Sequence, residues 1–171
     1  MSCLTSTERP LAMADIELDL DVPSGTLAEV VEVLHAAFLQ FGDAGKPSGA
    51  MLETVESLDG ERAEGTRIGV ARLGGRVVAV VKHRPTEDGR LYFSRLGVAP
   101  GHRGRGIAGA LVHALREDAH ARTLRGLACS VRAEETGNIA LYERLGMSVW
   151  GHGRQRSLTG AEIPVVRMRD A

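Results

Sequence analysis

The chain has 171 residues, 43% of them hydrophobic and 25% charged, with a formal net charge of −1 at pH 7. This length fits one domain that buries a core without disulfides or a structural metal, and the charge balance excludes broad attraction to nucleic acid or an anionic membrane. Cys3 and Cys129 lie far apart, which argues against a disulfide framework or a zinc site. With no stretch of signal-peptide or membrane-spanning character, the sequence predicts a cytoplasmic protein.

The hydrophobic pattern alternates along the chain between the periods of strands and of helices. Residues 1–13 show no period and are predicted to form a disordered tail, followed by a single domain over residues 14–171. The predicted elements are a strand over 16–20, a helix over 26–41 capped by Thr26, a shorter helix over 49–58 ended by Asp59-Gly60, strands over 68–73, 77–82 and 91–98, a helix over 106–121, a strand over 124–131, a helix over 138–145, and a last hairpin over 148–150 and 165–168 across a long glycine-rich connection. Gly74-Gly75 suits the turn of the first hairpin. This order predicts a mixed α/β fold whose sheet begins antiparallel.

The segment Pro100 to Gly106 joins a predicted strand to the start of a predicted helix. Three glycines within six residues let backbone amides turn toward one point, and the free N–H groups and dipole of the helix N-terminus favour a negative ligand there. The segment also contains His102, Arg103 and Arg105. In a chain of near-zero net charge this pattern predicts a local phosphate site; the competing interpretation is a tight turn with solvated arginines.

A dinucleotide-binding interpretation competes, because Gly104 to Gly109 reads G-x-G-x-x-G. That fingerprint opens a parallel βαβ unit and needs an acidic residue about 20 positions on, at the end of the second strand. Here the acidic pair Glu134-Glu135 comes too late, and the strands upstream read as hairpins. The nucleotide-binding fold therefore ranks well behind.

Two segments resemble motifs of the GNAT (GCN5-related N-acetyltransferase) superfamily. Leu96 to Ala108 resembles the cofactor-binding motif [RQ]-x-x-G-x-[GA], which matches here at Arg103, Gly106 and Ala108. Asn138 to Met147 resembles the family's LY-x-x-x-GF block about 35 residues on. The resemblance implies an acetyl-CoA-dependent N-acetyltransferase with a mixed, mostly antiparallel sheet that is splayed between its central strands and flanked by helices.

The resemblance also implies which residues act, with no metal involved. Pantetheine would lie between strands 91–98 and 127–131 and pair with the backbone of Leu96 and Val98, and an N–H near Val98 would donate to the thioester oxygen. Tyr142 would be the general acid that protonates the departing thiolate. The implied cofactor-binding residues are Leu96, Gly97, Val98, His102, Arg103, Gly104, Arg105, Gly106, Ile107, Ala108, Asn138 and Tyr142. Two positions depart from the family pattern: Met147 stands where Phe is usual, and Glu135 where many members carry Asn.

The general base and the acceptor stay open. Tyr92, Ser94 and Glu135 are candidates for activating a water, while His113 is expected to face solvent and Cys129 to be a small buried strand residue. The acceptor is expected to be the primary amine of a small molecule, amino acid or peptide, bound by loops 41–58, 82–90 and 151–163. A non-catalytic acyl-CoA-binding domain of the same fold remains the alternative. An edge strand at 165–168 would favour a homodimer.

Overall fold

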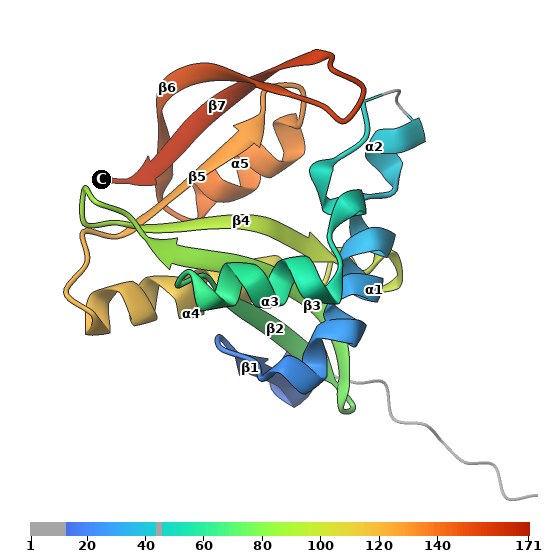
Figure 1. The fold of residues 1–171 in the computed structure, drawn as a ribbon. Coiled ribbons are helices and arrows are strands. Elements are labelled where there is room, and N and C mark those ends of the chain that lie inside the picture. Colours follow the sequence, from blue (N-terminus) through green and yellow to red (C-terminus); the bar gives the residue numbers. More distant parts are fainter. Residues whose placement is uncertain (1–12, 44–45) are drawn as a thin grey trace, which may run out of the picture.

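A computed structural model describes residues 13–43 and 46–171 (Figure 1). The predicted tail, apart from Met13, lies outside these residues. Seven strands form one sheet in the order β1-β2-β3-β4-β5-β7-β6, in which only β4 and β5 pair in parallel. The strands are β1 (Ile16–Asp19), β2 (Arg67–Leu73), β3 (Arg76–Pro85), β4 (Leu91–Val98), β5 (Leu127–Arg132), β6 (Met147–Arg156) and β7 (Glu162–Asp170). The predicted mixed, mainly antiparallel fold is confirmed.

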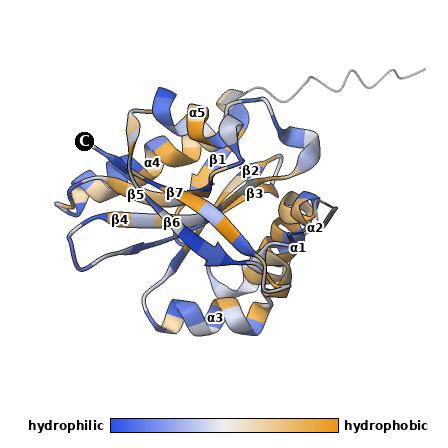
Figure 2. Cartoon of the chain, turned by 90° about the horizontal axis from the view of Figure 1, so that it is seen from above, coloured by the Kyte–Doolittle hydropathy of each residue, from blue (hydrophilic) through white to orange (hydrophobic). Residues whose placement is uncertain are grey.

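Helices cover both faces of the sheet, and each face has its own hydrophobic core. The helices are α1 (Leu27–Phe38), α2 (Gln40–Asp43), α3 (Val55–Ala63), α4 (Ile107–Ala121) and α5 (Thr136–Arg144). The stripes of α1 and α3 pack on β2 and β3, while α4 and α5 pack on the opposite face around Phe93, Leu111 and Met168. Figure 2 shows α1 as predominantly hydrophobic, which fits its position against the sheet.

The first hairpin forms as predicted, whereas the helix predicted over 49–58 does not form over that range. Gly74 and Gly75 have φ of 57° and 80°, which a two-residue turn between twisted strands requires. The helix predicted over 49–58 is instead a 3₁₀ turn followed by α3, because Thr54 and Ser57 form a reciprocal capping box that starts the helix at Val55. The predicted stop at Asp59-Gly60 is wrong, and the predicted Thr26 cap makes no side-chain hydrogen bond.

The C-terminal hairpin is much longer than its sequence indicates. The predicted glycine-rich connection over 151–163 is mostly strand, and the two strands are joined by residues 157–161 alone. A Cβ at Gly153 would come within 3.1 Å of the guanidinium of Arg167, which would then have to shift by a few tenths of an ångström. The predicted edge at 165–168 is also wrong, since β7 lies between β5 and β6. The edge strand at this end of the sheet is β6, whose far end is hydrophilic (Figure 2).

The central strands β4 and β5 separate soon after they meet. They pair only at Leu91↔Leu127 and Tyr92↔Ala128, and beyond Tyr92 the two strands diverge. A register shift between β3 and β4 accompanies the divergence, and Arg95 on β4 has a φ of 54°, unusual for a residue with a side chain. The predicted splay is thus present and leaves backbone groups of β4 unpaired toward β5.

Candidate functional site

A cavity of about 510 Å³ lies where β4 and β5 part. Its walls are the end of β4, the loop before α4, the C-terminal end of α1, and α5. Eleven of the twelve predicted cofactor-binding residues line it, namely Leu96, Gly97, Val98, His102, Arg103, Gly104, Gly106, Ile107, Ala108, Asn138 and Tyr142. Arg105 does not line it and is exposed. Sequence segments more than 40 residues apart therefore meet around one space.

The loop before α4 has the backbone shape of an anion cradle. Gly104 and Gly106 adopt φ of 75° and 78°, in the left-handed region that glycine enters without strain. Gly106 is the N-cap of α4 and supplies no side-chain acceptor, so the first-turn amides lack the usual cap. The buried Nδ1 of His102 has no hydrogen-bond partner among the described residues. Free donors at a helix N-terminus fit the pyrophosphate of a nucleotide cofactor.

Arg103 makes hydrogen bonds within the protein that its position in the motif does not predict. Its Nη2 donates to the Ala37 carbonyl (2.9 Å), its Nη1 to Gln40 Oε1 (2.9 Å) and its Nε to the Val98 carbonyl (3.2 Å). These bonds tie the loop to the end of α1 and to the end of β4. Arg103 therefore fixes the shape of the cradle while its side chain still borders the cavity.

The C-terminal end of α1 forms a wall that the sequence analysis missed. Ala37 and Phe38 approach β4 so closely that a Cβ at Gly97 would lie 2.8 Å from the Ala37 Cβ and 2.7 Å from the Phe38 ring. Only glycine allows this contact. A glycine inside an otherwise apolar strand is a signal of close approach that could have indicated it. The other lining residues that were not predicted are Gln40, Phe41, Gly109, Glu135, Leu141 and Arg144.

Tyr142 lies at the inner end of the cavity. It is 7% exposed, and its ring meets that of Phe93 edge to face at a centroid distance of 5.6 Å. Burial raises the pKa of the Tyr142 phenol well above its usual value, with a smaller contribution from Cys129. No described residue hydrogen-bonds to its hydroxyl. The phenol is therefore held protonated, with its donor available to whatever occupies the cavity.

A second cavity of about 240 Å³ continues from the first. The two share Phe38, Phe41, Leu96, Glu135, Asn138 and Tyr142. Of the candidate bases, Glu135 lies at this junction, whereas Tyr92 and Ser94 line only the second cavity and a neighbouring polar one. Loops 41–58 and 151–163 contribute to the second cavity as predicted, but no residue of 82–90 does.

Two further expectations are met. Cys129 is 4% exposed, and burial raises the pKa of its thiol to about 12, with a smaller contribution from Asp170. A thiol held in this way is not a nucleophile at neutral pH. His113 is exposed on α4, 3.3 Å from Glu117.

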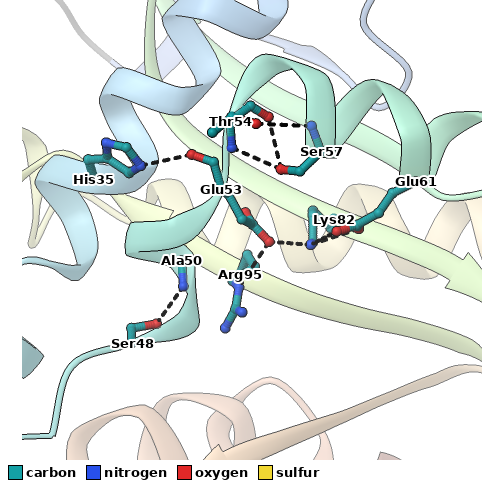
Figure 3. Close-up of polar contacts among 9 residues, drawn as sticks. All are labelled: His35, Ser48, Ala50, Glu53, Thr54, Ser57, Glu61, Lys82 and Arg95. Carbon is teal, nitrogen blue, oxygen red and sulfur yellow. Dashed lines mark hydrogen bonds and ion pairs between the residues drawn. The ribbon is translucent and has the colours of Figure 1, made fainter. Parts of the chain in front are cut away.

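Glu53, Lys82, Glu61 and Arg95 form a buried ion cluster (Figure 3), of which Arg95 lines the second cavity. Glu53, which is 7% exposed, accepts from Lys82 Nζ at 2.5 Å and from Arg95 Nε at 3.4 Å. Lys82 also donates to Glu61, at 2.8 and 3.0 Å. The cluster holds the 3₁₀ turn at 49–52, β3 and the irregular part of β4 together, and so fixes where Arg95 lies.

Glu53→Gln is expected to lower the free energy of unfolding by about 3 kcal/mol, because Lys82 and Arg95 would lose a buried counter-charge. Glu61→Gln is the matched control: its carboxylate contacts the same Lys82 but is 37% exposed, so about 1 kcal/mol or less is expected. Urea denaturation of the two variants measures the difference. Equal losses would contradict the role given to Glu53.

Within the described ranges, no helix has both the length and the apolar content that crossing a membrane requires. The same residues contain no group of three or more His, Cys, Asp or Glu side chains that could hold a metal ion.

Comparison with known proteins places this geometry in a family. Over 87 residues the chain is 34% identical to N-acetyltransferase 8F1 of Mus musculus, a stretch that covers 48% of this chain and 39% of that protein, so the match spans well under two thirds of the relative. The fold is similar to the crystal structure of the ribosomal-protein-S18-alanine N-acetyltransferase from Escherichia coli, with a TM-score of 0.73, 18% identity, and coverage of 91% of this chain and 92% of that one.

A putative acetyltransferase from Salmonella typhimurium, solved with its cofactor acetyl-CoA, gives a TM-score of 0.71 at 16% identity, with coverage of 91% and 92%. At these identities the structures show the fold alone. The profile of the acetyltransferase (GNAT) family matches residues 30–147. Because this match covers more than half of the chain, the chain belongs to that family.

Proposed function

We propose that the protein is an acetyl-CoA-dependent N-acetyltransferase that transfers acetyl to a primary amine of a small molecule, amino acid or peptide. The observation that carries the proposal is the pair of connected cavities: the glycine-rich cradle lines the first and not the second, and Tyr142 lines both. Such a passage suits two substrates that meet at one point.

Acetyl-CoA supplies the activated acyl group as a thioester, and the protein supplies position and proton control. The amides at the start of α4 and the left-handed Gly104 and Gly106 hold the pyrophosphate. The unpaired edge of β4 around Leu96 and Val98 holds the pantetheine amides. Tyr142 donates its proton to the departing thiolate, because the buried phenol is protonated at neutral pH and holds a proton when the carbon–sulfur bond breaks.

The acceptor must lose a proton before it can attack. A lysine-like amine of pKa about 10.4 is neutral only about once in 2,500 molecules at pH 7. Among the three candidate bases, Glu135 lies at the junction of the cavities and therefore closest to both substrates. We place the acceptor amine beside it.

Ligand-dependent thermal shifts and thiol release test the proposal together. Acetyl-CoA is expected to raise the melting temperature, whereas NAD and ATP should not. Incubation with acetyl-CoA and a mixed amine library should then release free thiol. A higher melting temperature with acetyl-CoA but no thiol release across the library would favour a non-catalytic acyl-CoA-binding domain. A higher melting temperature with NAD or ATP would favour the dinucleotide-binding interpretation.

Assembly and location belong to the same proposal. The edge strand β6 exposes Val149 and Trp150, with 36% and 50% of their surface accessible. Exposed strand edges are usually paired or protected, so we propose a homodimer formed through this edge, in the cytoplasm. Sedimentation is expected to give a dimer at micromolar concentration; a monomer throughout that range would exclude it.

A further inference from the structure

The second cavity has a pronounced charge gradient. Its lining includes three arginines, Arg95, Arg132 and Arg156, and one carboxylate, Glu135. Glu135 lies at the junction with the first cavity, where Tyr142 is, while the three arginines line only the second cavity. The negative end of the gradient is therefore at the proposed point of reaction, and the positive end is away from it.

Arg132 is held in place by backbone carbonyls and an aromatic ring, and among the described residues it forms no ion pair. Its Nη1 donates to the Lys46 carbonyl (2.7 Å), its Nη2 to the Pro47 carbonyl (3.4 Å), and its guanidinium lies 4.3 Å from the centre of the Phe41 ring. No carboxylate whose side chain the structure describes comes within 4.0 Å of it.

The pKa of Arg132 reflects this setting. Burial lowers it most, the carboxylates of Glu134 and Glu135 oppose that effect, and the charge of Arg95 lowers it further. A bound anion would offset both the cost of burying the Arg132 charge and the repulsion between the guanidinium groups of Arg132 and Arg95.

Arg95 and Arg156 approach from two other directions. Arg95 donates from Nε to Glu53, which orients its guanidinium. The guanidinium lies over the backbone of Gly49, which lines the cavity: a Cβ added at Gly49 would be 2.8 Å from the Arg95 Nη2. Arg156, at the end of β6, pairs with Glu162 of β7 through its backbone, while its side chain makes no hydrogen bond or ion pair with any described residue. Its neighbour on the same strand, Arg154, is paired with Glu162 at 2.7 Å and does not line the cavity.

We infer that the acceptor is an amine that carries an anionic group, a carboxylate or a phosphate, which is bound by Arg95, Arg132 and Arg156 while the amine faces Glu135 and Tyr142. This deepens the proposed function and rests on it. Guanidinium groups match both anions through paired, charge-assisted hydrogen bonds. A diamine or polyamine would instead place a second cation among three arginines, and an amine with no anionic group would bring no negative charge to them.

Matched acceptor pairs test the inference. Thiol release from acetyl-CoA is measured with L-alanine and L-phenylalanine, each against its α-carboxamide, with phosphoethanolamine against ethanolamine, and with cadaverine. At least one anionic member is expected to exceed its neutral partner about tenfold or more in kcat/KM, the effect of a charged hydrogen bond. The arm that responds, carboxylate or phosphate, identifies the anion. The ammonium of an amino-acid amide is the more acidic one, so the amide would be favoured if the anion made no contribution.

Variants that remove one positive charge test which arginines cause the preference for anionic acceptors. Arg156→Gln is expected to raise KM for the preferred anionic acceptor about tenfold and leave KM for its neutral partner unchanged. Arg154→Gln removes the same charge from the same strand outside the cavity and should change neither. Arg95→Gln should also reduce the preference, with acetyl-CoA affinity kept.

The outcomes separate the two proposals. Equal or better use of neutral or cationic amines, or a preference for anionic amines that Arg156→Gln and Arg95→Gln leave intact, would overturn the inference and retain the acetyltransferase. If acetyl-CoA binds and no member of any pair is acetylated, the proposed function fails, and the inference fails with it.

Discussion

A Gly106→Glu variant is expected to be folded and to have lost acetyl-CoA binding, with the Kd raised about 1,000-fold or more. Gly106 is the left-handed N-cap of α4, with φ of 78°, and it lines the proposed cofactor cavity. A glutamate there would place a carboxylate where the amides meet the pyrophosphate; two charges 4 Å apart near a protein surface repel by about 4 kcal/mol, which corresponds to roughly 1,000-fold in affinity. Forcing a side chain into the left-handed region adds about 1 kcal/mol of strain, too little to unfold a typical domain.

Isothermal calorimetry with acetyl-CoA measures this, with circular dichroism to verify the fold. Gly101→Glu is the matched control, because Gly101 precedes the cradle, does not line the cavity, and has open space around its Cβ position. It introduces the same charge and should bind nearly as the wild type does. Unchanged affinity in a folded Gly106→Glu protein would refute the cradle assignment.

Tyr142→Phe is expected to lower kcat by roughly ten- to a thousandfold while acetyl-CoA affinity is nearly kept. The phenylalanine ring retains the edge-to-face packing on Phe93, so the fold and the cavity wall remain. Only the hydroxyl is lost. Since burial raises the phenol pKa, that group is a neutral donor in the wild type, and its removal costs no charge. The loss therefore falls on the transition state, in which the thiolate needs a proton.

The chain contains one other tyrosine, which provides the control. Tyr92 is half-buried on β4 and lines the second cavity but not the first. Tyr92→Phe should therefore leave kcat within a factor of a few of the wild type. Steady-state kinetics under conditions where chemistry limits turnover decide between the two tyrosines. Wild-type kcat in Tyr142→Phe would remove this residue from the mechanism.

Much of the scaffold of the site could be read from local patterns. The strand over 91–98 and the helix that begins after Gly106 were predicted to within a residue, because an apolar run bounded by turns and a glycine loop leading into an amphipathic stripe are short-range signals. The hairpin at Gly74-Gly75 has the same origin. Features that depend on a few consecutive residues were accessible in this way.

The features that failed depend on distant partners. The C-terminal strands extend through Gly151 and Gly153, which have low strand propensity, because the long partner β7 supplies the hydrogen bonds and Arg167 occupies the space that glycine leaves. The wall formed by α1 and the tether from Arg103 to Ala37 both cross about 60 residues of sequence. A motif identifies the loop but not the helix that closes it.

The arginines of the second cavity illustrate the same limit. Arg95, Arg132 and Arg156 come from β4, β5 and β6, and none belongs to a recognisable motif. Their proximity follows from the splay of the sheet and from the bend of Arg95, neither of which leaves a local signature. The grouping of these arginines was therefore not readable from the sequence, while the glycine loop before α4 was.

The brief pairing of β4 with β5 has a consequence for how the molecule comes apart. Among the described residues only two pairs join β4 to β5, so the two parts of the sheet are held together mainly by the shared core around Phe93, Leu111 and Met168 and little by backbone hydrogen bonds. A ligand that bridges the diverging strands would act as the missing part of the sheet and couple them. Among residues 94–98 and 130–132, the amide hydrogens that point into the gap would then exchange fast in the free protein and slowly in the complex, while those paired with β3 or β7 would be protected in both.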